Sequence, residues 1–570
     1  MIQSTRILVS DLALANVPKL VAMILQLAYH FISDQGDVAA DDHVIDEELS
    51  MEALEEIDVS EEEDEDDEET PSPVMPALRS HSGLLWSLQT AQQHPPGREP
   101  VRNSFRPSHV GFSIGFHPQT PSEAFKAFFG DSLHLSLLHT NREGRRIAAS
   151  NHTTWIPISM TELESFVGLH LIAGALKAGH RDTRELWDLR NGNPIFRASM
   201  SFQRFQQIKA ALRFDNKMRR DRTDPLAPIR EVVDQVNSSL ESHYHPGSLL
   251  CVDEQLVEFH GRVRFQQYLR SKPGKFGIKI FWITDTENSF PLRCLVYVGK
   301  ETLPASERDC PISEAVVMHL AKAYLGVGRN ITMDNWFTSV NLCDRLTDAK
   351  TSVVGTIRSN RRGVPPAAKS SQGRTKGDSR HFVSDQKVLC SYFDKGNAPV
   401  LLLSTKHTYG KHNRNEKPEI VECYNATKSG VDNLDKLVRT YRSQRKCRRW
   451  PYSVFMALMD VAVIAAMRSM AATNHYSFKM DLGYEMTLPL ARERATHSRL
   501  TNSIKVAMEL VGIKPNISQP AVDSNQRRRC QICLVEGVKE RKTRFKCAEC
   551  QKAICIQHAA KTVHYCPDCL

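Results

Sequence analysis

The sequence predicts a multidomain α/β protein whose core is a mixed sheet covered by helices. Three observations support this fold class. Between residues 249 and 358, short strand-like apolar runs are interspersed with helical periods. Before and after that stretch, apolar residues recur at helical spacing. Residues 530–569 instead hold pairs of cysteine and histidine at the spacing of metal ligands.

Length and charge indicate the number of domains and the class of binding partner. At 570 residues the chain is long enough for several domains. Its formal net charge is +8, but residues 41–69 hold 18 acidic residues and no lysine or arginine. The rest of the chain therefore carries 74 basic against 48 acidic side chains, an excess of +26. Such a basic body indicates a polyanionic partner, most often nucleic acid. No transmembrane helix and no membrane partner are predicted.

Residues 1–115 are predicted to form a disordered, acidic N-terminal region. The acidic tract is followed, up to about residue 110, by a stretch rich in proline, serine and glycine. We interpret the tract either as a solvated charge run or as a tail that masks the basic body. Helical patterns follow within residues 116–247, at 122–129, 160–176, 201–214 and 230–244.

The stretch 248–360 has the element order of an RNase H-like domain. Strands are predicted at 249–257, 278–284, 292–298, 330–333 and 352–358, and helices at 313–325 and 339–350. In that fold, metal-binding acids sit on the first strand, just after the fourth strand, and on a late helix. Asp253 lies in the first strand and Asp334 directly after the fourth, where α/β sheets place their chemistry. Taken alone, Asp334 is more simply a turn or helix-capping acid.

Residues 361–415 interrupt this order and are predicted to be an insertion, because they are rich in lysine, arginine, serine and glycine. The last core helix, within residues 416–443, begins near Gly430 and carries Asp432 as the natural third acid. Asp435 follows one helical turn later and faces the same way, so it is placed to reinforce the site. Both acids also fit the plainer role of complementing the dipole at a helix N-terminus.

Seven short stretches, taken in order, carry a family resemblance. They are LRFDNK (212–217), VDEQL (252–256), KPGKFGIK (272–279), NITMDNWFTS (330–339), VGTIRSN (354–360), GVDNLD (430–435) and RWP (449–451). In these stretches the chain resembles piggyBac-type transposases. The resemblance covers about residues 116–570 and leaves the first hundred or so residues outside it.

The resemblance implies a catalytic site and a reaction. Carried over position by position, the family's catalytic aspartates fall on Asp253, Asp334 and Asp432, and its additional acid falls on Asp435. These acids would bind two Mg²⁺ ions per active site, with Asp253 and Asp432 holding the pair and Asp334 completing one coordination sphere. The family cuts double-stranded DNA at transposon ends and inserts them at TTAA by phosphoryl transfer, through hairpin intermediates.

The resemblance also implies a partner copy and a DNA interface. Helices at residues 116–247 and 444–517 would join in one dimerisation and DNA-binding domain, so that the chain works as a homodimer. The apolar pattern at 454–467 is expected to be dimer or domain core. Basic residues interleaved with aromatic rings after the third acid suit phosphate contacts and base stacking. The predicted DNA-contact residues are Arg358, Arg361, Arg439, Arg442, Arg445, Lys446, Arg448, Arg449 and Trp450.

A cysteine-rich segment, residues 530–570, follows a linker at residues 518–529. Its four ligand pairs are Cys530-x2-Cys533, Cys547-x2-Cys550, Cys555-x2-His558 and Cys566-x2-Cys569. Eight ligands at this spacing predict two Zn²⁺ sites, and so small a segment needs the metal in order to fold. In cross-brace order the first and third pairs share one ion, and the second and fourth share the other. The finger is expected either to read DNA or to bind a chromatin peptide.

The sequence therefore predicts a metal-dependent DNA transposase of the piggyBac type. Its basic clusters resemble nuclear localisation signals, so the nucleus is the expected location. The alternative is a host-adopted DNA- or chromatin-binding protein that keeps the fold and the finger but no longer moves DNA. The intact acids favour the enzyme, whereas the N-terminal region outside the resemblance leaves room for the alternative.

Overall fold

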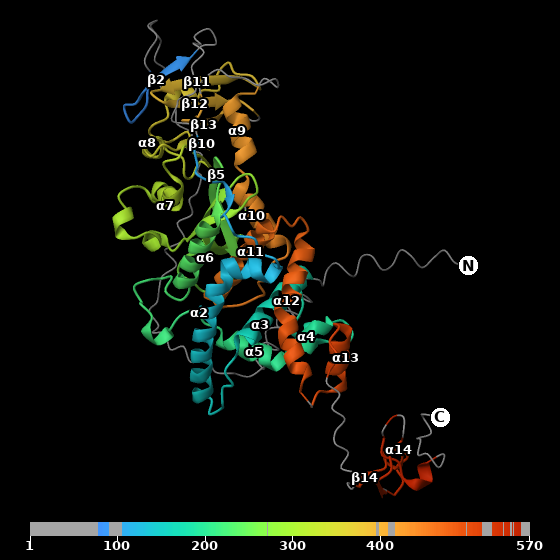
Figure 1. Cartoon of the computed structure of the whole chain (residues 1–570). Coiled ribbons are helices and arrows are strands. Elements are labelled where there is room, and N and C mark those ends of the chain that lie inside the picture. Colours follow the sequence, from blue (N-terminus) through green and yellow to red (C-terminus); the bar gives the residue numbers. More distant parts are fainter. Residues whose placement is uncertain are drawn as a thin grey trace, which may run out of the picture. The chain divides into compact units, whose positions relative to one another are not determined.

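One mixed β-sheet organises the fold of the described residues between 78 and 515 (Figure 1). The structure is a computed structural model that describes residues 78–89, 105–270, 272–394, 398–407, 417–497, 499–515, 527–539, 541–547, 550 and 552–559. The acidic N-terminal tract, Cys566 and Cys569, about which the sequence makes predictions, lie outside these residues.

Five strands form the centre of the sheet in the order β8-β7-β5-β9-β10. They are β5 (Leu249–Glu258), β7 (Phe276–Asp285), β8 (Pro291–Val296), β9 (Asn330–Met333) and β10 (Ser352–Thr356). β7 is antiparallel to β5 and β8, whereas β9 is parallel to both β5 and β10. Along the chain these strands follow one another as the sequence predicts. The order within the sheet sets β5 directly beside β9. A short strand, β6 (Gln266–Tyr268), also pairs with β7.

Helices flank this sheet on two sides. The helices are α7 (Ile312–Ala321), α8 (Val340–Asp348), α9 (Glu419–Thr427) and α10 (Gly430–Thr440). Figure 1 shows α7 and α8 on one side of the strands and α9 and α10 on the other. All four residues of β9 are buried, as a parallel strand covered on both faces requires.

The segment predicted as an insertion, residues 361–415, extends the same sheet. It contributes β11 (Ser379–Ser384), β12 (Lys387–Tyr392) and β13 (Val400–Ser404), and β13 pairs antiparallel with β10. All six residues of β12 are buried. These strands were not predicted because a polar stretch rich in lysine, serine and glycine, residues 369–377, precedes β11 and dominates the composition of the segment. The strands of this insertion therefore continue the core sheet beyond β10.

The predicted disorder of residues 1–115 is wrong for residues 78–89. Strands β1 (Leu78–Arg79) and β2 (Leu85–Gln89) form a hairpin, and β2 adds to the edge of β11. Trp86 is only 1% exposed, and its indole N–H donates to the carbonyl of Gly363 at 3.0 Å. This short apolar run has no core of its own, so composition alone cannot reveal the sheet edge that buries it.

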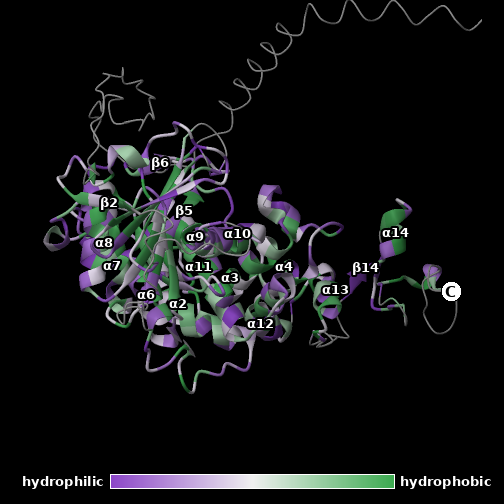
Figure 2. Cartoon of the chain, turned by 90° about the horizontal axis from the view of Figure 1, so that it is seen from above, coloured by the Kyte–Doolittle hydropathy of each residue, from purple (hydrophilic) through white to green (hydrophobic). Residues whose placement is uncertain are grey.

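Helices that precede the core strands in the sequence pack against helices that follow them. Those before the strands are α2 (Pro121–Ser150), α3 (Met160–Ala175), α4 (Pro194–Ser199), α5 (Phe202–Ala211) and α6 (Arg230–His243). Those after the strands are α11 (Trp450–Ser469), α12 (His475–Ala495) and α13 (Asn502–Leu510). α3 packs on α12, and α2 packs on α11 and α6. Figure 2 shows hydrophobic residues gathered along the strands and hydrophilic residues on the surrounding loops.

Helix α11 is a core helix tied to its neighbours by a buried ion pair. It is long and apolar enough to cross a membrane, but 89% of its apolar window is buried inside the protein. Its Asp460 lies 2.6 Å from the Nζ of Lys479 on α12, and both side chains are fully enclosed. Asp460 also accepts the backbone N–H and hydroxyl of Ser443 at 2.8 and 2.7 Å. The loop that follows α10 is thereby fastened to the helices.

Smaller elements complete the described residues. β3 (Gly111–Phe112) pairs with β4 (Tyr244–His245) at the end of α6. The cysteine-rich segment contains β14 (Arg528–Arg529), α14 (Gln531–Val535) and β15 (Lys542–Thr543). With elements this short, the segment lacks an apolar core of useful size.

The edge strand β2 provides a test of the sheet. We predict that Trp86→Ala lowers the free energy of unfolding by about 3–5 kcal/mol, because it removes a fully buried aromatic side chain. Chemical denaturation followed by circular dichroism measures the effect. Leu85→Ala is the matched control, since Leu85 is the preceding residue of β2 and is 51% exposed. Equal midpoints for the two variants would contradict the placement of β2.

Candidate active site

Asp253 and Asp334 meet because β5 and β9 are parallel neighbours. The register pairs Val252 with Met333, so the next residue along each strand is an aspartate. Carboxylate oxygens of Asp253, Asp334 and Glu254 all lie within 4.8 Å of one another. The sequence prediction that the first two acids converge is therefore realised in the structure.

The loop after β9 fixes the orientation of Asp334. One carboxylate oxygen, Oδ1, accepts the backbone N–H of Trp336 at 3.0 Å. The carbonyl of Asp334 accepts the hydroxyl of Thr338 at 2.8 Å. The observed position of Asp334 is thus compatible both with a role in the turn and with a role as a metal ligand. The turn holds one oxygen and leaves the carboxylate beside Asp253.

Glu254 is a member of the acid cluster that was not predicted from the sequence. Consecutive side chains of a strand normally point to opposite faces of the sheet. If Asp253 points into the site, the side chain of Glu254 is therefore expected to point away from it. Here the backbone N–H of Glu254 donates to Oδ1 of Asp253 at 2.8 Å, and the Glu254 carboxylate still reaches the cluster. The adjacent acids in the VDEQL stretch were the only signal available.

Helix α10 brings two further acids to the same cavity, which has a volume of about 660 Å³. Asp432 is 60% exposed and lies 3.1 Å from Nζ of Lys272. Asp435 is buried and accepts the side-chain amide of Gln255 at 2.9 Å, and Gln255 in turn accepts the indole N–H of Trp282 at 3.0 Å. Both acids line the cavity, as predicted, but the carboxylate of Asp435 is directed into the sheet.

Crowding makes the acid cluster electrostatically costly without a cation. Burial, together with the charges of Glu254 and Asp334, raises the pKa of Asp253 to about 8, against the opposing effect of Lys272. Burial and Glu254 also raise the pKa of Asp334. Carboxylate oxygens are the ligands that hard divalent cations prefer. The donor set therefore fits a divalent metal ion held by Asp253 and Asp334, with Glu254 and Asp432 within the same cavity.

A lysine is fixed next to these acids by aromatic rings. The Nζ of Lys279 on β7 lies 5.4, 5.5 and 5.9 Å from the ring centres of Trp336, Phe281 and Tyr297. Phe281 and Trp336 are themselves stacked, with their centres 5.3 Å apart. Burial lowers the pKa of Lys279, although the charge of Glu254 raises it. Cation–π contacts of this kind restrict an ammonium group without neutralising it.

Four of the predicted DNA-contact residues lie close to the acid cavity. Arg358 donates to the side chain of Asn335 at 3.3 Å, and Arg361 donates to the carbonyl of Trp336 at 2.9 Å. These two arginines therefore hold the loop that carries Asp334. Arg439 lines the cavity with its guanidinium 3.8 Å from Asp435. Arg442 pairs with Glu258 at 2.7 Å.

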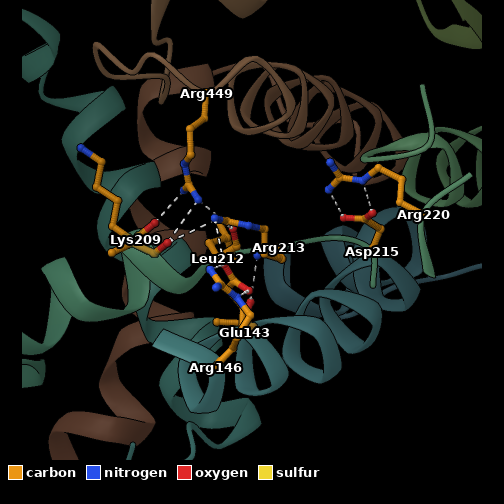
Figure 3. Close-up of polar contacts among 10 residues, drawn as sticks. Glu143, Arg146, Lys209, Leu212, Arg213, Asp215, Arg220 and Arg449 are labelled. Carbon is orange, nitrogen blue, oxygen red and sulfur yellow. Dashed lines mark hydrogen bonds and ion pairs between the residues drawn. The ribbon is translucent and has the colours of Figure 1, made fainter. Parts of the chain in front are cut away.

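Three others make contacts within the protein. Arg445 is only 6% exposed, and its guanidinium donates to the carbonyls of Ala178, at 2.8 Å, and Arg181. Arg449 donates to three carbonyls at the end of α5, those of Lys209, Ala210 and Leu212 (Figure 3). Trp450 packs edge-on against Phe265, with ring centres 5.1 Å apart. In contrast, Lys446 and Arg448 are exposed.

The LRFDNK stretch (212–217) also contributes to the packing of the helices. Figure 3 shows Arg213 and Arg146 directed at the same glutamate, Glu143 on α2. Arg213 lies 3.1 Å and Arg146 2.8 Å from its carboxylate. Burial raises the pKa of Glu143, but the two arginines outweigh it, so the net shift is downward. A single buried carboxylate therefore joins α2 to the loop after α5.

The cysteine-rich segment brings its first and third ligand pairs together. Ligand atoms of Cys530, Cys533, Cys555 and His558 lie within 4.8 Å of one another. Sγ of Cys533 lies 3.8 Å from Sγ of Cys555, and Nδ1 of His558 lies 3.4–3.5 Å from all three sulfurs. The edge of a tetrahedron with metal–sulfur bonds of about 2.3 Å is about 3.8 Å. The set fits a tetrahedral ion.

The surroundings of this cluster also suit a metal. Nε2 of His558 lies 3.1 Å from the carboxylate of Glu536, which fixes the ring so that Nδ1 faces the sulfurs. Burial raises the pKa of the Cys533 thiol to about 11, together with contacts to Cys530 and Cys555. Burial acts in the same sense on Cys530, but hydrogen bonds from the backbone of Cys533 and from His558 outweigh it and lower the pKa of Cys530 to about 6. A bound cation would favour the thiolate form of both ligands. Of the second set, Cys547 is buried and Cys550 exposed, and their predicted partners lie outside the described residues.

Arg445 and Lys446 are neighbours in the sequence, but the first is buried and the second is exposed. Substituting each one in turn distinguishes a role in stability from a role in DNA binding. We predict that Arg445→Met lowers the free energy of unfolding by about 1–3 kcal/mol, because two carbonyls lose their charged donor. We expect Lys446→Met to leave stability within about 0.5 kcal/mol. It should also weaken binding to a DNA duplex. The slope of the logarithm of the binding constant against the logarithm of the salt concentration should become smaller in magnitude by about 1. Denaturation and fluorescence anisotropy measure the two effects, and a reversed pattern would contradict the assignment.

Comparisons with known proteins agree with this geometry. A family model described as Transposase IS4 matches residues 120–467, more than half of the chain. The human piggyBac transposable element-derived protein 3 is 23% identical over 365 residues, and the human piggyBac transposable element-derived protein 2 is 22% identical over 369 residues. Each match covers 60% of this chain, and the chain spans about 60% of the length of either relative.

A solved structure matches over more of the chain. The cryo-EM structure of a piggyBac transposase synaptic complex with hairpin DNA superimposes with a TM-score of 0.71 and 28% sequence identity. The match covers 81% of this chain and 100% of that one. Together with the family model, this match establishes that the chain belongs to the piggyBac transposase family.

Proposed function

We propose that the chain is a metal-dependent DNA transposase that cuts transposon ends and inserts them at TTAA. The observation that carries the proposal is the convergence of Asp253 and Asp334 at neighbouring parallel strands, with Asp432 in the same cavity. Carboxyl groups with raised pKa values, gathered from distant parts of the chain into one cleft, are characteristic of functional sites. The matched piggyBac transposase complex contains hairpin DNA, which supports a hairpin intermediate here.

Asp253, Asp334 and Asp432 would hold two Mg²⁺ ions, and their oxygens are the correct ligands for them. Bound there, Mg²⁺ would supply charge stabilisation at the phosphate and a more acidic attacking hydroxyl. The protein itself orients the reaction. The turn at Asp334 fixes one carboxylate, and the Gln255 contact of Asp435 fixes α10 against β5. Preorganised groups of this kind avoid reorganisation during the reaction.

Accessible cations around the cavity would bind the DNA backbone. Arg439 lines the cavity, whereas Lys446 and Arg448 are exposed on the loop that follows α10. Each neutralised phosphate releases counterions and adds sequence-independent affinity. A homodimer acting in the nucleus on two transposon ends is part of the proposal. The helices before and after the core, which pack together, would supply its interface.

The catalytic proposal is tested by strand cleavage. A DNA duplex that carries candidate transposon ends beside TTAA should be nicked in the presence of Mg²⁺. Asp334→Ala should lower the rate on the order of 10³-fold, because the cavity loses a metal ligand. Asp348→Ala is the matched control, since Asp348 is an exposed acid at the end of α8. Nicking without Mg²⁺, or at an unchanged rate in Asp334→Ala, would contradict the proposal.

The cysteine-rich segment is proposed to bind two Zn²⁺ ions, one of them at Cys530, Cys533, Cys555 and His558. Metal analysis of the full chain should find about two zinc ions. Cys533→Ser should remove about one of them, whereas Cys423→Ser, in α9, should remove none. Glu536→Gln should keep the stoichiometry and weaken zinc retention about 10-fold, because the imidazole loses its carboxylate partner. A zinc content unchanged in Cys533→Ser would contradict the site.

A second candidate function rests on the two human relatives, whose names describe them as derived from a transposable element. In that case the chain would bind DNA or chromatin without moving DNA. The cleavage assay separates the two functions. Salt-dependent binding of the duplex with no Mg²⁺-dependent nicking favours the second candidate.

A further inference from the structure

Lys272 contacts two of the elements that carry the proposed metal ligands. Its Nζ donates to the carbonyl of Glu254 on β5 at 3.0 Å and lies 3.1 Å from Oδ1 of Asp432 on α10. The side chain is 14% exposed, compared with 60% for Asp432. The lysine is therefore the more desolvated partner, and its charge needs an anion within the cavity.

The position of Lys272 conflicts with a metal ion bound by Asp432. Oδ1 of Asp432 cannot accept the hydrogen bond of the Lys272 ammonium and also coordinate a divalent cation without strong repulsion between the two positive charges. Lysine has a flexible four-carbon stem, which allows the ammonium to move by several ångströms. Lys272 also belongs to the loop between β6 and β7, which joins strands at the edge of the sheet.

We propose that Lys272 is an exchangeable counter-cation of the acid cavity. It neutralises Asp432 while no metal is bound, and it transfers to a phosphate of the DNA backbone once a divalent cation has taken Asp432. Metal loading and DNA binding are then coupled through one side chain. This inference rests on the proposed function, because it requires the acids to bind metal.

Metal binding without DNA is the first test. Mn²⁺ binding to the full chain is followed by the electron paramagnetic resonance signal of the free ion. Lys272→Met should bind Mn²⁺ on the order of ten-fold more tightly, since a competing positive charge is removed. Lys272→Arg, which keeps the charge, should bind close to the wild type. Lys275→Met is the matched control, because Lys275 lies in the same loop and is exposed.

A merely structural lysine would give the opposite result. If Lys272 only positions Asp432, Lys272→Met binds Mn²⁺ as the wild type does or more weakly, and the proposal is overturned. Circular dichroism verifies the fold of each variant, and Lys272→Gln replaces Lys272→Met if that variant fails to fold. Mn²⁺ binding that survives Asp334→Ala in the wild-type background overturns the metal site itself. Loss of binding in Asp334→Ala, with no gain in Lys272→Met, overturns only the role of Lys272.

DNA binding is the second test. The probe is a duplex oligonucleotide that contains TTAA, titrated with and without Ca²⁺, an oxygen-ligated cation. Ca²⁺ should tighten DNA binding by the wild type and by Lys275→Met severalfold more than by Lys272→Met, because only the first two release an ammonium to the phosphate. An equal gain in all three proteins overturns the transfer to DNA.

Discussion

The parallel pairing of β5 with β9 is the constraint on which the candidate site depends. It places Asp253 and Asp334 at neighbouring strand positions, so their carboxylates repel each other as soon as the sheet forms. Burial, reinforced by the charges of Glu254 and Asp334, raises the pKa of Asp253. A fold that maintains such a cluster must be stabilised elsewhere, and it gains a site that favours a cation. Helix α10 then covers β5 and delivers Asp432 to the same cavity.

The positive charges near the cavity divide into two groups with different physical roles. Arg445 and Arg449 use their hydrogen-bonding capacity on backbone carbonyls of the helices, and Asp460 with Lys479 locks α11 to α12. These contacts hold the loop after α10 in place. Lys446 and Arg448 remain exposed. A run of basic residues in a sequence does not reveal this division, because guanidinium groups suit carbonyls and phosphates equally well.

Prediction from the sequence was most successful where a local pattern determines the structure. The strand order from β5 to β10 and the positions of Asp253, Asp334 and the helix of Asp432 follow from periodicity and short motifs. It failed where burial depends on distant partners. Trp86 is buried only because β11 offers a free edge, and Glu254 joins the acids despite the alternation of strand side chains. The ligand pairing of Cys530 and Cys533 with Cys555 and His558 was predictable, since cross-brace spacing is itself a structural rule.

The central claim is that the carboxylates of the cavity hold divalent cations. Anomalous X-ray diffraction from crystals grown with Mn²⁺ tests it most directly, because manganese scatters distinctly from every atom of the protein. We predict anomalous peaks within coordination distance of Asp253, Asp334 and Asp432, with Lys272 turned away from Asp432. Crystals with no peak in the cavity would contradict the claim, whereas Lys272 still paired to Asp432 beside a fully occupied ion would overturn only the role of Lys272.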